Sequence, residues 1–249
     1  MSSSNADLLF LGFALLIVGL VAFYNGLKNF RLKLLIENTP TSKIRSIAMG
    51  SVEVYGKIIP LPLKILKAPF SGRDCVWCKW TVEEWRKSKH GGYWNKFKDG
   101  LISDYFYIND NSGTVLVDPK NANVDTPCDF TEEVGSNRTL LGTIRSLKVS
   151  TDIFGIPRTL RVAEQALSEN EFVYVLGTAI DNPFVAEGTA VKHEADVLIS
   201  KAGNFFLISE NSEKNLLSQT RAITKLGIIS GIVMIIIGLL IIFLRLGKL

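Results

Sequence analysis

The sequence predicts a mainly β (α+β) soluble domain of antiparallel hairpins, inserted between two transmembrane α-helices. Two uncharged apolar segments, Leu8–Leu27 and Leu226–Leu244, lie near the two ends of the 249-residue chain. Between them, short segments of alternating apolar and polar residues are separated by turn sequences. No repeated βαβ spacing is visible, and strands joined by short turns favour an antiparallel arrangement.

The two terminal segments have the length of membrane spans. A hydrocarbon core about 30 Å thick needs roughly 20 apolar helical residues, and a helix satisfies its own backbone polar groups in lipid. A buried helix of a soluble protein is the alternative for Leu226–Leu244, and a cleaved signal peptide is the alternative for Leu8–Leu27. Against the signal peptide, Met1–Asp7 contains no Lys or Arg, and no Ala-x-Ala pattern follows the apolar segment.

The basic residues beside the spans predict which side of the membrane the domain faces. They are concentrated between the spans, whereas only Arg245 and Lys248 lie outside them. The positive-inside rule therefore places residues 28–225 in the cytoplasm and leaves short external tails at 1–7 and 245–249. We expect a multi-pass protein of a prokaryotic cell membrane, or of a mitochondrial membrane in a eukaryote. The charged residues between the spans are Lys28, Arg31, Lys33, Lys43 and Arg45 on one side and Lys214, Arg221 and Lys225 on the other.

Glycines inside the spans recur at intervals that favour close helix packing. Small residues at such spacing let two helix backbones approach each other, although glycine is also common in membrane helices generally. Both a contact within one chain and a homo-oligomer contact between chains fit this pattern. The glycines are Gly12, Gly19 and Gly26 in the first span, and Gly227, Gly231 and Gly238 in the second.

The first half of the domain begins with a short expected helix over 40–48, after a capping hydroxyl and Pro40. Strand Ser51–Ile59 should follow, with Val52, Val54 and Ile58 on one face. Strand Val76–Arg86 should pair with Leu101–Ile108 across a Gly- and Lys-rich loop, and Thr114–Asp118 should return from the turn at Asn109–Gly113.

The second half predicts two more hairpins and a helix. Leu160–Leu167 should pair with Phe172–Ile180, and Ala195–Ser200 with Asn204–Ser209. Residues 210–225 should form a helix that continues into the second span, while Asn121–Ser150 contains no clear pattern.

Few residues could support chemistry. The Cys75-x-x-Cys78 pair could bind a metal or act as a redox pair, but a zinc site takes four ligands. Only Cys128, His90 and His193 could complete it, at no recognised spacing. The motif opens a strand, which favours ordinary packing cysteines, so we predict no catalytic residue, no cofactor and no metal. Asp110–Gly113 resembles the start of a calcium loop but lacks its final glutamate, and a hairpin turn is the better interpretation.

An aromatic and basic cluster is the strongest candidate for an interaction surface. Such interleaving occurs in single-stranded nucleic-acid binders, in headgroup contacts, in protein interfaces and in the core or rim of a hairpin. The net charge of +4 is mild, and we predict membrane lipid and an unknown cytoplasmic protein as partners, with no nucleic acid. The surface comprises Trp77, Trp85, Arg86, Lys87, Lys89, Tyr93, Trp94 and Lys96.

Five segments of the sequence form a recognisable set: Glu37–Ser46, Gly50–Gly56, Pro69–Gly72 with Cys75, Trp80–Glu84 and Tyr174–Thr178. Together they resemble the GIDE domain of the MULAN/GIDE family of membrane-embedded E3 ubiquitin ligases. The resemblance covers most of 38–210 and includes one span on either side. In those ligases a RING zinc domain follows the second span, whereas here only five residues follow Leu244, so we expect a prokaryotic-type member without the RING.

The sequence therefore predicts a membrane-tethered binding, sensing or scaffold module without its own catalysis. One alternative, implied by the resemblance, is a non-RING component of an E3-like system that selects substrates. The other is a metal or redox site at Cys75 and Cys78.

Overall fold

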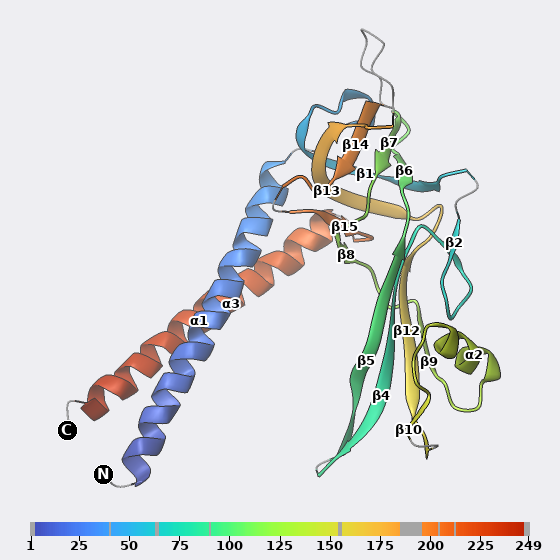
Figure 1. Cartoon of the computed structure of the whole chain (residues 1–249). Coiled ribbons are helices and arrows are strands. Elements are labelled where there is room, and N and C mark those ends of the chain that lie inside the picture. Colours follow the sequence, from blue (N-terminus) through green and yellow to red (C-terminus); the bar gives the residue numbers. More distant parts are fainter. Residues whose placement is uncertain are drawn as a thin grey trace. The chain divides into compact units, whose positions relative to one another are not determined.

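The chain folds into two units, which we call the helix pair and the β domain (Figure 1). The helix pair consists of Met1–Pro40 and Ser212–Leu249, and the β domain of Thr41–Asn211. The structure is a computed structural model. It describes residues 3–39, 41–62, 65–89, 91–153, 156–184, 196–203, 205–211 and 213–246.

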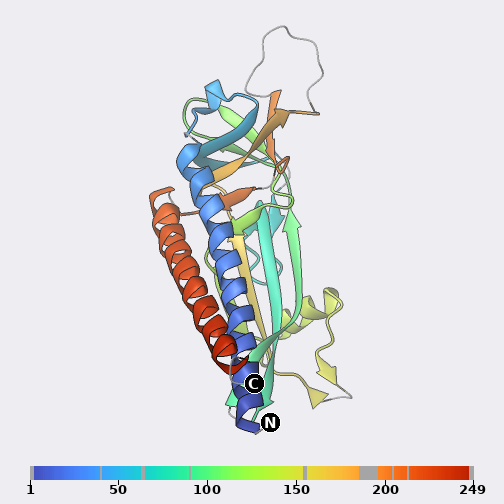
Figure 2. The same ribbon diagram turned by 90° about the vertical axis from the view of Figure 1, so that its left-hand side faces the viewer.

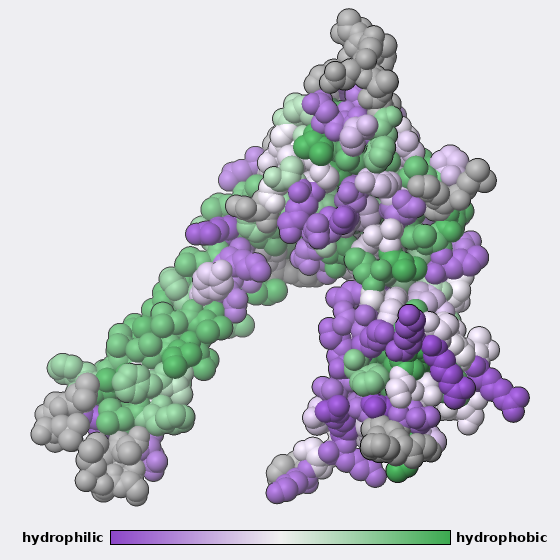
Figure 3. All heavy atoms as spheres, in the orientation of Figure 1, coloured by the Kyte–Doolittle hydropathy of each residue, from purple (hydrophilic) through white to green (hydrophobic). Residues whose placement is uncertain are grey.

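The helix pair is formed by α1 (Ser3–Asn38) and α3 (Glu213–Leu246), which contact each other; they cross in Figure 1 and lie side by side in Figure 2. Both are long and apolar enough to cross a membrane, over Asp7–Asn38 and Asn215–Arg245. Hydrophobic residues cover most of their visible surface (Figure 3). The helix expected over 210–225 does continue into the second apolar segment without a break.

The β domain contains a closed barrel. Strand β1 (Gly50–Pro60) pairs with both β6 (Phe106–Asn109) and β13 (Phe172–Asp181), which closes the ring. Strands β7 (Thr114–Val117) and β14 (Val197–Ser200) complete the order β1-β6-β7-β14-β13, and β7 and β14 are parallel. A five-stranded Greek-key barrel with this connectivity is of the OB-fold type.

Alternation along the strands fills the barrel. Val52, Val54 and Ile58 of β1 are 3%, 0% and 0% exposed, which confirms the predicted buried face. Phe106 and Ile108 of β6 face the same core, and both are fully buried. Two short strands, β15 (Leu207–Ser209) and β8 (Asn123–Asp125), extend the sheet beyond β13.

A second, four-stranded sheet is inserted into the barrel's connections, in the order β5-β4-β12-β9. Residues 61–105, between β1 and β6, contain β4 (Trp77–Ser88) and β5 (Gly91–Ser103), the long hairpin of Figure 1. Residues 118–171, between β7 and β13, supply β9 (Phe130–Glu133), α2 (Arg138–Ser146) and β12 (Leu160–Leu167). The remaining strands form two small ladders: β2 (Leu66–Lys67) with β3 (Asp74–Cys75), and β10 (Asp152–Ile153) with β11 (Ile156–Pro157).

Helix α2 packs against one face of this second sheet. The Asn137 side chain caps the helix by accepting from the Thr139 and Leu140 backbone N–H groups at 3.1 and 3.3 Å. Leu140 and Ile144 then join Trp80 and Val82 of β4 in a second apolar core. This helix, together with β8 and β9, occupies the segment Asn121–Ser150 in which the sequence showed no pattern.

The fold class is confirmed, but several predicted pairings are wrong. The partner of β4 is β5 at Gly91–Ser103 rather than Leu101–Ile108, because residues expected to form a loop continue as strand. Strands Leu160–Leu167 and Phe172–Ile180 exist, but they belong to different sheets. The segments expected at 195–200 and 204–209 both pair with β13 rather than with each other.

The glycine-rich segment of the hairpin was predicted to be a loop, but it continues as strand because two of its glycines leave room for indole rings of the neighbouring strand. A Cβ on Gly92 would lie under 3.0 Å from the Trp85 ring, and one on Gly100 equally close to the Trp80 ring. Aromatic side chains that cover glycine in a neighbouring strand stabilise such sheets. Near the start of the domain, the helix expected over 40–48 is only a 3-10 turn at Ile44–Ser46.

Candidate functional site

The outer half of the β4–β5 hairpin contains most of the predicted interaction surface. Trp85 and Trp94 are cross-strand partners, and their rings meet edge to face with centroids 5.2 Å apart. Trp85 is 37% exposed and Tyr93 is 52% exposed, both large values for aromatic side chains. The structure thus brings three aromatic rings together on one hairpin, of which Trp85 and Tyr93 are exposed and Trp94 is half-buried.

An arginine from the neighbouring strand holds this aromatic pair in place. The Arg161 guanidinium lies 4.5 Å from the Trp94 ring centroid, in a cation–π contact. Its Nη2 atom is also 2.5 Å from the Glu83 carboxylate, across the β4–β12 ladder. Arg158, which lies just before β12, stacks 4.4 Å from the Phe97 centroid and pairs with Glu84 at 2.8 Å. Each arginine therefore joins a ring to a carboxylate, which limits the motion of the rings.

Cations surround the aromatic pair. Arg86, Lys87, Lys89 and Lys96 are all exposed. Arg86 is paired with Glu84 at 3.1 Å and Lys96 with Asp99 at 3.0 Å. Within the described part of the chain, Lys87 and Lys89 make no ion pair, so their charge is available to a partner.

Trp77 does not belong to this surface. It is 4% exposed and packs inside the barrel with Val76 and Phe106. The reason is that β4 begins beside the barrel and only later leaves it, so the start and end of this strand have different surroundings. We therefore define the hairpin surface as Trp85, Arg86, Lys87, Lys89, Tyr93, Trp94 and Lys96.

The sequence did not identify Arg158 and Arg161, which orient the rings. Arg161 lies in β12 between Leu160 and Val162, which are 2% and 0% exposed, and Arg158 lies just before this strand. The available signal was Glu83-Glu84, two adjacent acidic residues in a strand rich in tryptophan. Such residues on a half-buried sheet need cationic partners from a neighbouring strand.

The two cysteines of the C-x-x-C motif are buried. Cys75 is 1% exposed and Cys78 is fully buried, in a small cluster with Ala68 and Ala166. A hydrogen bond with Cys75 and burial together raise the pKa of the Cys78 thiol far above its usual range. Among the described residues, no group of three or more His, Cys, Asp or Glu side chains is arranged to hold a metal ion. His90 and His193 lie outside the described residues.

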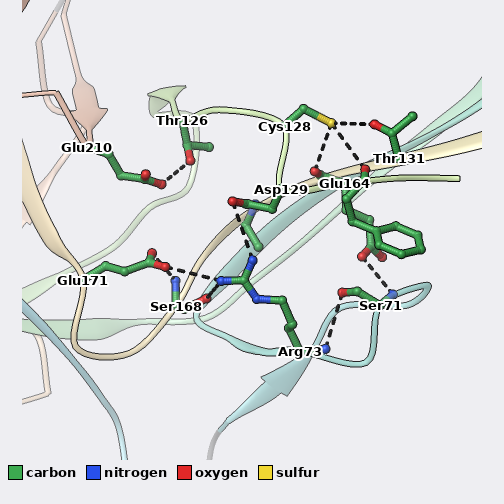
Figure 4. Close-up of polar contacts among 12 residues, drawn as sticks. Ser71, Arg73, Thr126, Cys128, Asp129, Thr131, Glu164, Ser168, Glu171 and Glu210 are labelled. Carbon is green, nitrogen blue, oxygen red and sulfur yellow. Dashed lines mark hydrogen bonds and ion pairs between the residues drawn. The ribbon is translucent and has the colours of Figure 1, made fainter.

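A polar network lies where the barrel meets the second sheet (Figure 4). Arg73 donates to Ser168 at 3.1 Å and pairs with Asp129 at 3.6 Å and Glu171 at 3.5 Å. The buried Glu164 carboxylate accepts from the backbone N–H groups of Phe70 and Ser71 at 2.6 and 3.0 Å. These contacts join the loop before β3 to β12 and to the turn after it.

Two further contacts of Figure 4 involve the segment before β9. Thr126 donates its hydroxyl hydrogen to the Glu210 carboxylate. Burial raises the pKa of Glu210, although this hydrogen bond opposes the shift. The Cys128 thiol contacts the Thr131 hydroxyl at 3.1 Å. We interpret the network as structural, because each charged group in it is satisfied by a neighbour.

The glycines predicted to pack all lie at the contact between α1 and α3 of one chain. A Cβ on Gly12 would lie 3.3 Å from the Gly238 carbonyl oxygen, and one on Gly19 3.0 Å from the Gly231 carbonyl oxygen. A Cβ on Gly26 would lie 3.0 Å from the Gly227 carbonyl carbon. Each glycine of α1 thus faces one of α3, in the order expected for antiparallel helices.

Comparison with known proteins finds one family. The model of the family described as "GIDE: E3 Ubiquitin ligase" matches residues 93–243, from the second strand of the hairpin through most of α3. The similar segments between Glu37 and Glu84 lie before the matched region. Neither the search of curated proteins nor that of solved structures found a match.

Proposed function

Since the chain belongs to the GIDE family, we propose that it is a two-span membrane protein whose β domain binds a cytoplasmic protein partner without catalysing a reaction. The helix pair anchors the chain, and the hairpin surface makes the contact. The observation that supports this proposal most strongly is the Trp85–Trp94 pair, with Trp85 exposed, Trp94 half-buried and held by Arg161, and cations around both rings.

The chemistry of the hairpin surface suits a protein interface. Tryptophan, tyrosine and arginine dominate the binding energy of protein interfaces, and all three occur here. The rings are already ordered by Arg161, so binding would cost little additional side-chain entropy. The two unpaired lysines would attract an acidic surface and speed its association. We therefore propose a partner with an acidic patch around an apolar pocket.

The membrane arrangement is part of the same proposal. Both apolar helices would cross the bilayer, and the excess of Lys and Arg between them would keep the β domain on the cytoplasmic side. Extraction with alkaline carbonate tests the anchoring directly. The protein should remain with the membranes, and its release into the soluble fraction would contradict two spans.

Photocrosslinking in living cells tests the hairpin surface. A benzoylphenylalanine at Lys87 should yield a protein adduct, while one at the exposed Lys201 of the barrel serves as the control. Trp94→Ala should reduce the Lys87 adduct by about 30-fold, as expected for a hot-spot residue worth about 2 kcal/mol. Equal adducts at Lys87 and Lys201 would contradict the proposal, and an adduct to lipid alone would indicate a headgroup contact instead.

A second candidate function follows from the family description. As a member of a family of E3 ubiquitin ligases, the chain could select substrates for a ubiquitin-like transfer in which another chain supplies the zinc-binding RING. The three cysteines and two histidines of the sequence offer few zinc ligands. In this case the partner crosslinked at Lys87 would contain a RING, and the purified chain alone would not accelerate discharge of a ubiquitin-charged conjugating enzyme. Acceleration by the chain alone would contradict both functions as stated.

A further inference from the structure

We propose that the helix pair contains a binding site for the phosphate headgroup of an anionic membrane lipid, in a groove between α1 and α3. The inference rests on the membrane anchoring proposed above. The groove has a volume of about 440 Å³. It is lined by Phe30, Lys33, Arg221, Thr224, Lys225, Ile228 and Ile229.

The lining changes character along the groove. Lys33, Arg221 and Lys225 form its charged part, and Ile228 and Ile229 continue from it into the apolar segment of α3. A membrane lipid has the same order of groups, with a phosphate followed by a hydrocarbon chain. Basic pockets between membrane helices on the cytoplasmic side are a known form of headgroup site.

The charge of the groove favours an anion. Arg221 Nη2 lies 2.6 Å from Glu37 Oε1, and Lys33 Nζ lies 3.4 Å from Glu37 Oε2. The three cations of the groove, Lys33, Arg221 and Lys225, are thus opposed by one carboxylate, Glu37, which leaves a net charge of +2. Lys225 makes no ion pair with any residue in the described ranges of the chain, and its side chain is exposed. The site therefore has uncompensated charge at the level where the apolar segment begins.

An unsatisfied hydroxyl in the same groove points independently to a ligand. Thr224 is 5% exposed, and its Oγ1 atom has no hydrogen-bond partner among the described residues. A threonine hydroxyl in a helix ordinarily bonds the carbonyl oxygen three or four residues earlier. Rotation about χ1 exchanges the positions of Oγ1 and Cγ2, so the hydroxyl can donate to a phosphate oxygen held in the groove. A buried polar group without a partner is costly, and such a bond would remove that cost.

Lipid binding to the purified full chain tests this site. Native mass spectrometry in detergent would compare phosphatidylglycerol with zwitterionic phosphatidylcholine, and sn-glycerol 3-phosphate would be the soluble competitor. We expect phosphatidylglycerol to bind at least ten-fold more tightly than phosphatidylcholine. Lys225→Gln should weaken phosphatidylglycerol binding about five-fold, the factor typical of one cation near anionic lipid.

Two further variants separate this site from general charge attraction. Lys28→Gln removes an exposed cation of α1 that does not line the groove, and it should leave binding unchanged. Thr224→Val keeps the side-chain shape but removes the hydroxyl, so it should weaken binding without lowering the stability of the helix pair. Equal losses for Lys28→Gln and Lys225→Gln would overturn the proposal. So would unchanged binding in Thr224→Val.

The outcomes also separate the lipid site from the anchoring. If glycerol phosphate displaces the lipid at equal concentration, the groove recognises a soluble phosphate ester and the lipid assignment is wrong. If carbonate strips the wild-type chain from membranes, the proposed anchoring fails. If the chain resists carbonate but Lys225→Gln binds lipid as the wild type does, only the lipid site is refuted.

Discussion

Substitution of Gly19 by leucine should loosen the helix pair. A Cβ at this position would lie 2.9 Å from the Ile235 backbone nitrogen, 2.9 Å from its Cγ1 and 3.0 Å from the Gly231 carbonyl oxygen. Ordinary van der Waals contact begins at 3.4 Å, so even one added carbon requires a local separation of about 0.5 Å to reach it. Two of the three opposing atoms are backbone atoms, which cannot turn away as a side chain can.

Two opposing effects set the magnitude. Overpacking of a close contact costs about 1–3 kcal/mol, whereas replacing a helical glycine gains up to about 1 kcal/mol of helix propensity. Gly19→Ala should therefore lower the free energy of helix separation by about 0–2 kcal/mol. Gly19→Leu has the same propensity gain but three more carbons, so we expect about 2–3 kcal/mol. Val18→Leu is the control, because Val18 is 54% exposed and exposed substitutions change stability by about 0.5 kcal/mol or less.

Energy transfer between two dyes can measure the separation of the helices. Asp7→Cys and Leu244→Cys place the dyes on α1 and α3, with Cys128→Ser removing the exposed native thiol. Titration with a denaturing detergent then gives the free energy of separation for each variant. The order should be Val18→Leu, Gly19→Ala, Gly19→Leu from most to least stable. Equal stability of Gly19→Leu and Val18→Leu would refute the close contact.

Three further predictions concern the β domain. Urea unfolding monitored by tryptophan fluorescence measures the first. Gly100→Ala should lower the free energy of unfolding by about 1–3 kcal/mol, because its Cβ would meet a buried indole. Gly142→Ala should raise the free energy of unfolding by up to about 1 kcal/mol, because a Cβ there would have no atom within 4 Å. Asp110→Ala should cost about 1–3 kcal/mol near neutral pH, and this cost should shrink as the pH falls below about 4. Thiol titration should find that Cys128 alone of the three cysteines reacts in the native state, and that all three react in urea.

The pH dependence of the Asp110 variant follows from its surroundings. Burial alone would raise the pKa of Asp110, but bonds from the Ile44 N–H, the Ser112 hydroxyl and N–H, and the Gly113 N–H together lower it below its ordinary 3.8. A carboxyl group with a lowered folded-state pKa stabilises the protein above its unfolded-state pKa. That stabilisation is lost as the pH falls through the folded-state value. A cost of Asp110→Ala that stays constant from pH 7 to pH 3 would contradict these contacts.

The other two predictions have equally direct tests. Gly142→Ala is the control for Gly100→Ala, since both add one methyl group to the same domain. Equal stability changes in the two variants would show that Gly100 does not lie under the indole. Rapid labelling of any thiol in the native Cys128→Ser variant would show that Cys75 and Cys78 are less buried than the structure indicates.

Local patterns predicted the strands well but not their partners. The buried face of β1 and the turn at Asn109–Gly113 were both predicted correctly, because strand alternation and turn residues act over a few positions. The partners of β12 and β13 were predicted incorrectly, since the short turn between these strands passes from one sheet to the other instead of closing a hairpin. Closure of the barrel through β1 and β13 joins residues far apart in sequence, which no local pattern reveals.

The candidate surface was predicted from composition, and its errors have physical causes. The Trp85 ring is exposed, as the aromatic and basic cluster suggested, but Trp94 is half-buried and Trp77 is taken into the barrel core. Gly92 suggested a loop, yet the residue allows an indole to lie across the strand. Arg161 was missed because its partners lie in strands much earlier in the chain, as its ion pair with Glu83, 78 positions before it, shows.

The sidedness of the β domain is the most direct test of two spans with a cytoplasmic domain between them. A membrane-impermeant maleimide would be added to right-side-out and inside-out vesicles of a bacterial host that expresses the chain. One reporter is the native Cys128 in the β domain, and the other is Asp7→Cys in a Cys128→Ser background. We predict that Cys128 reacts only in inside-out vesicles and that position 7 reacts only in right-side-out vesicles. Labelling of both positions from the same side would contradict the account.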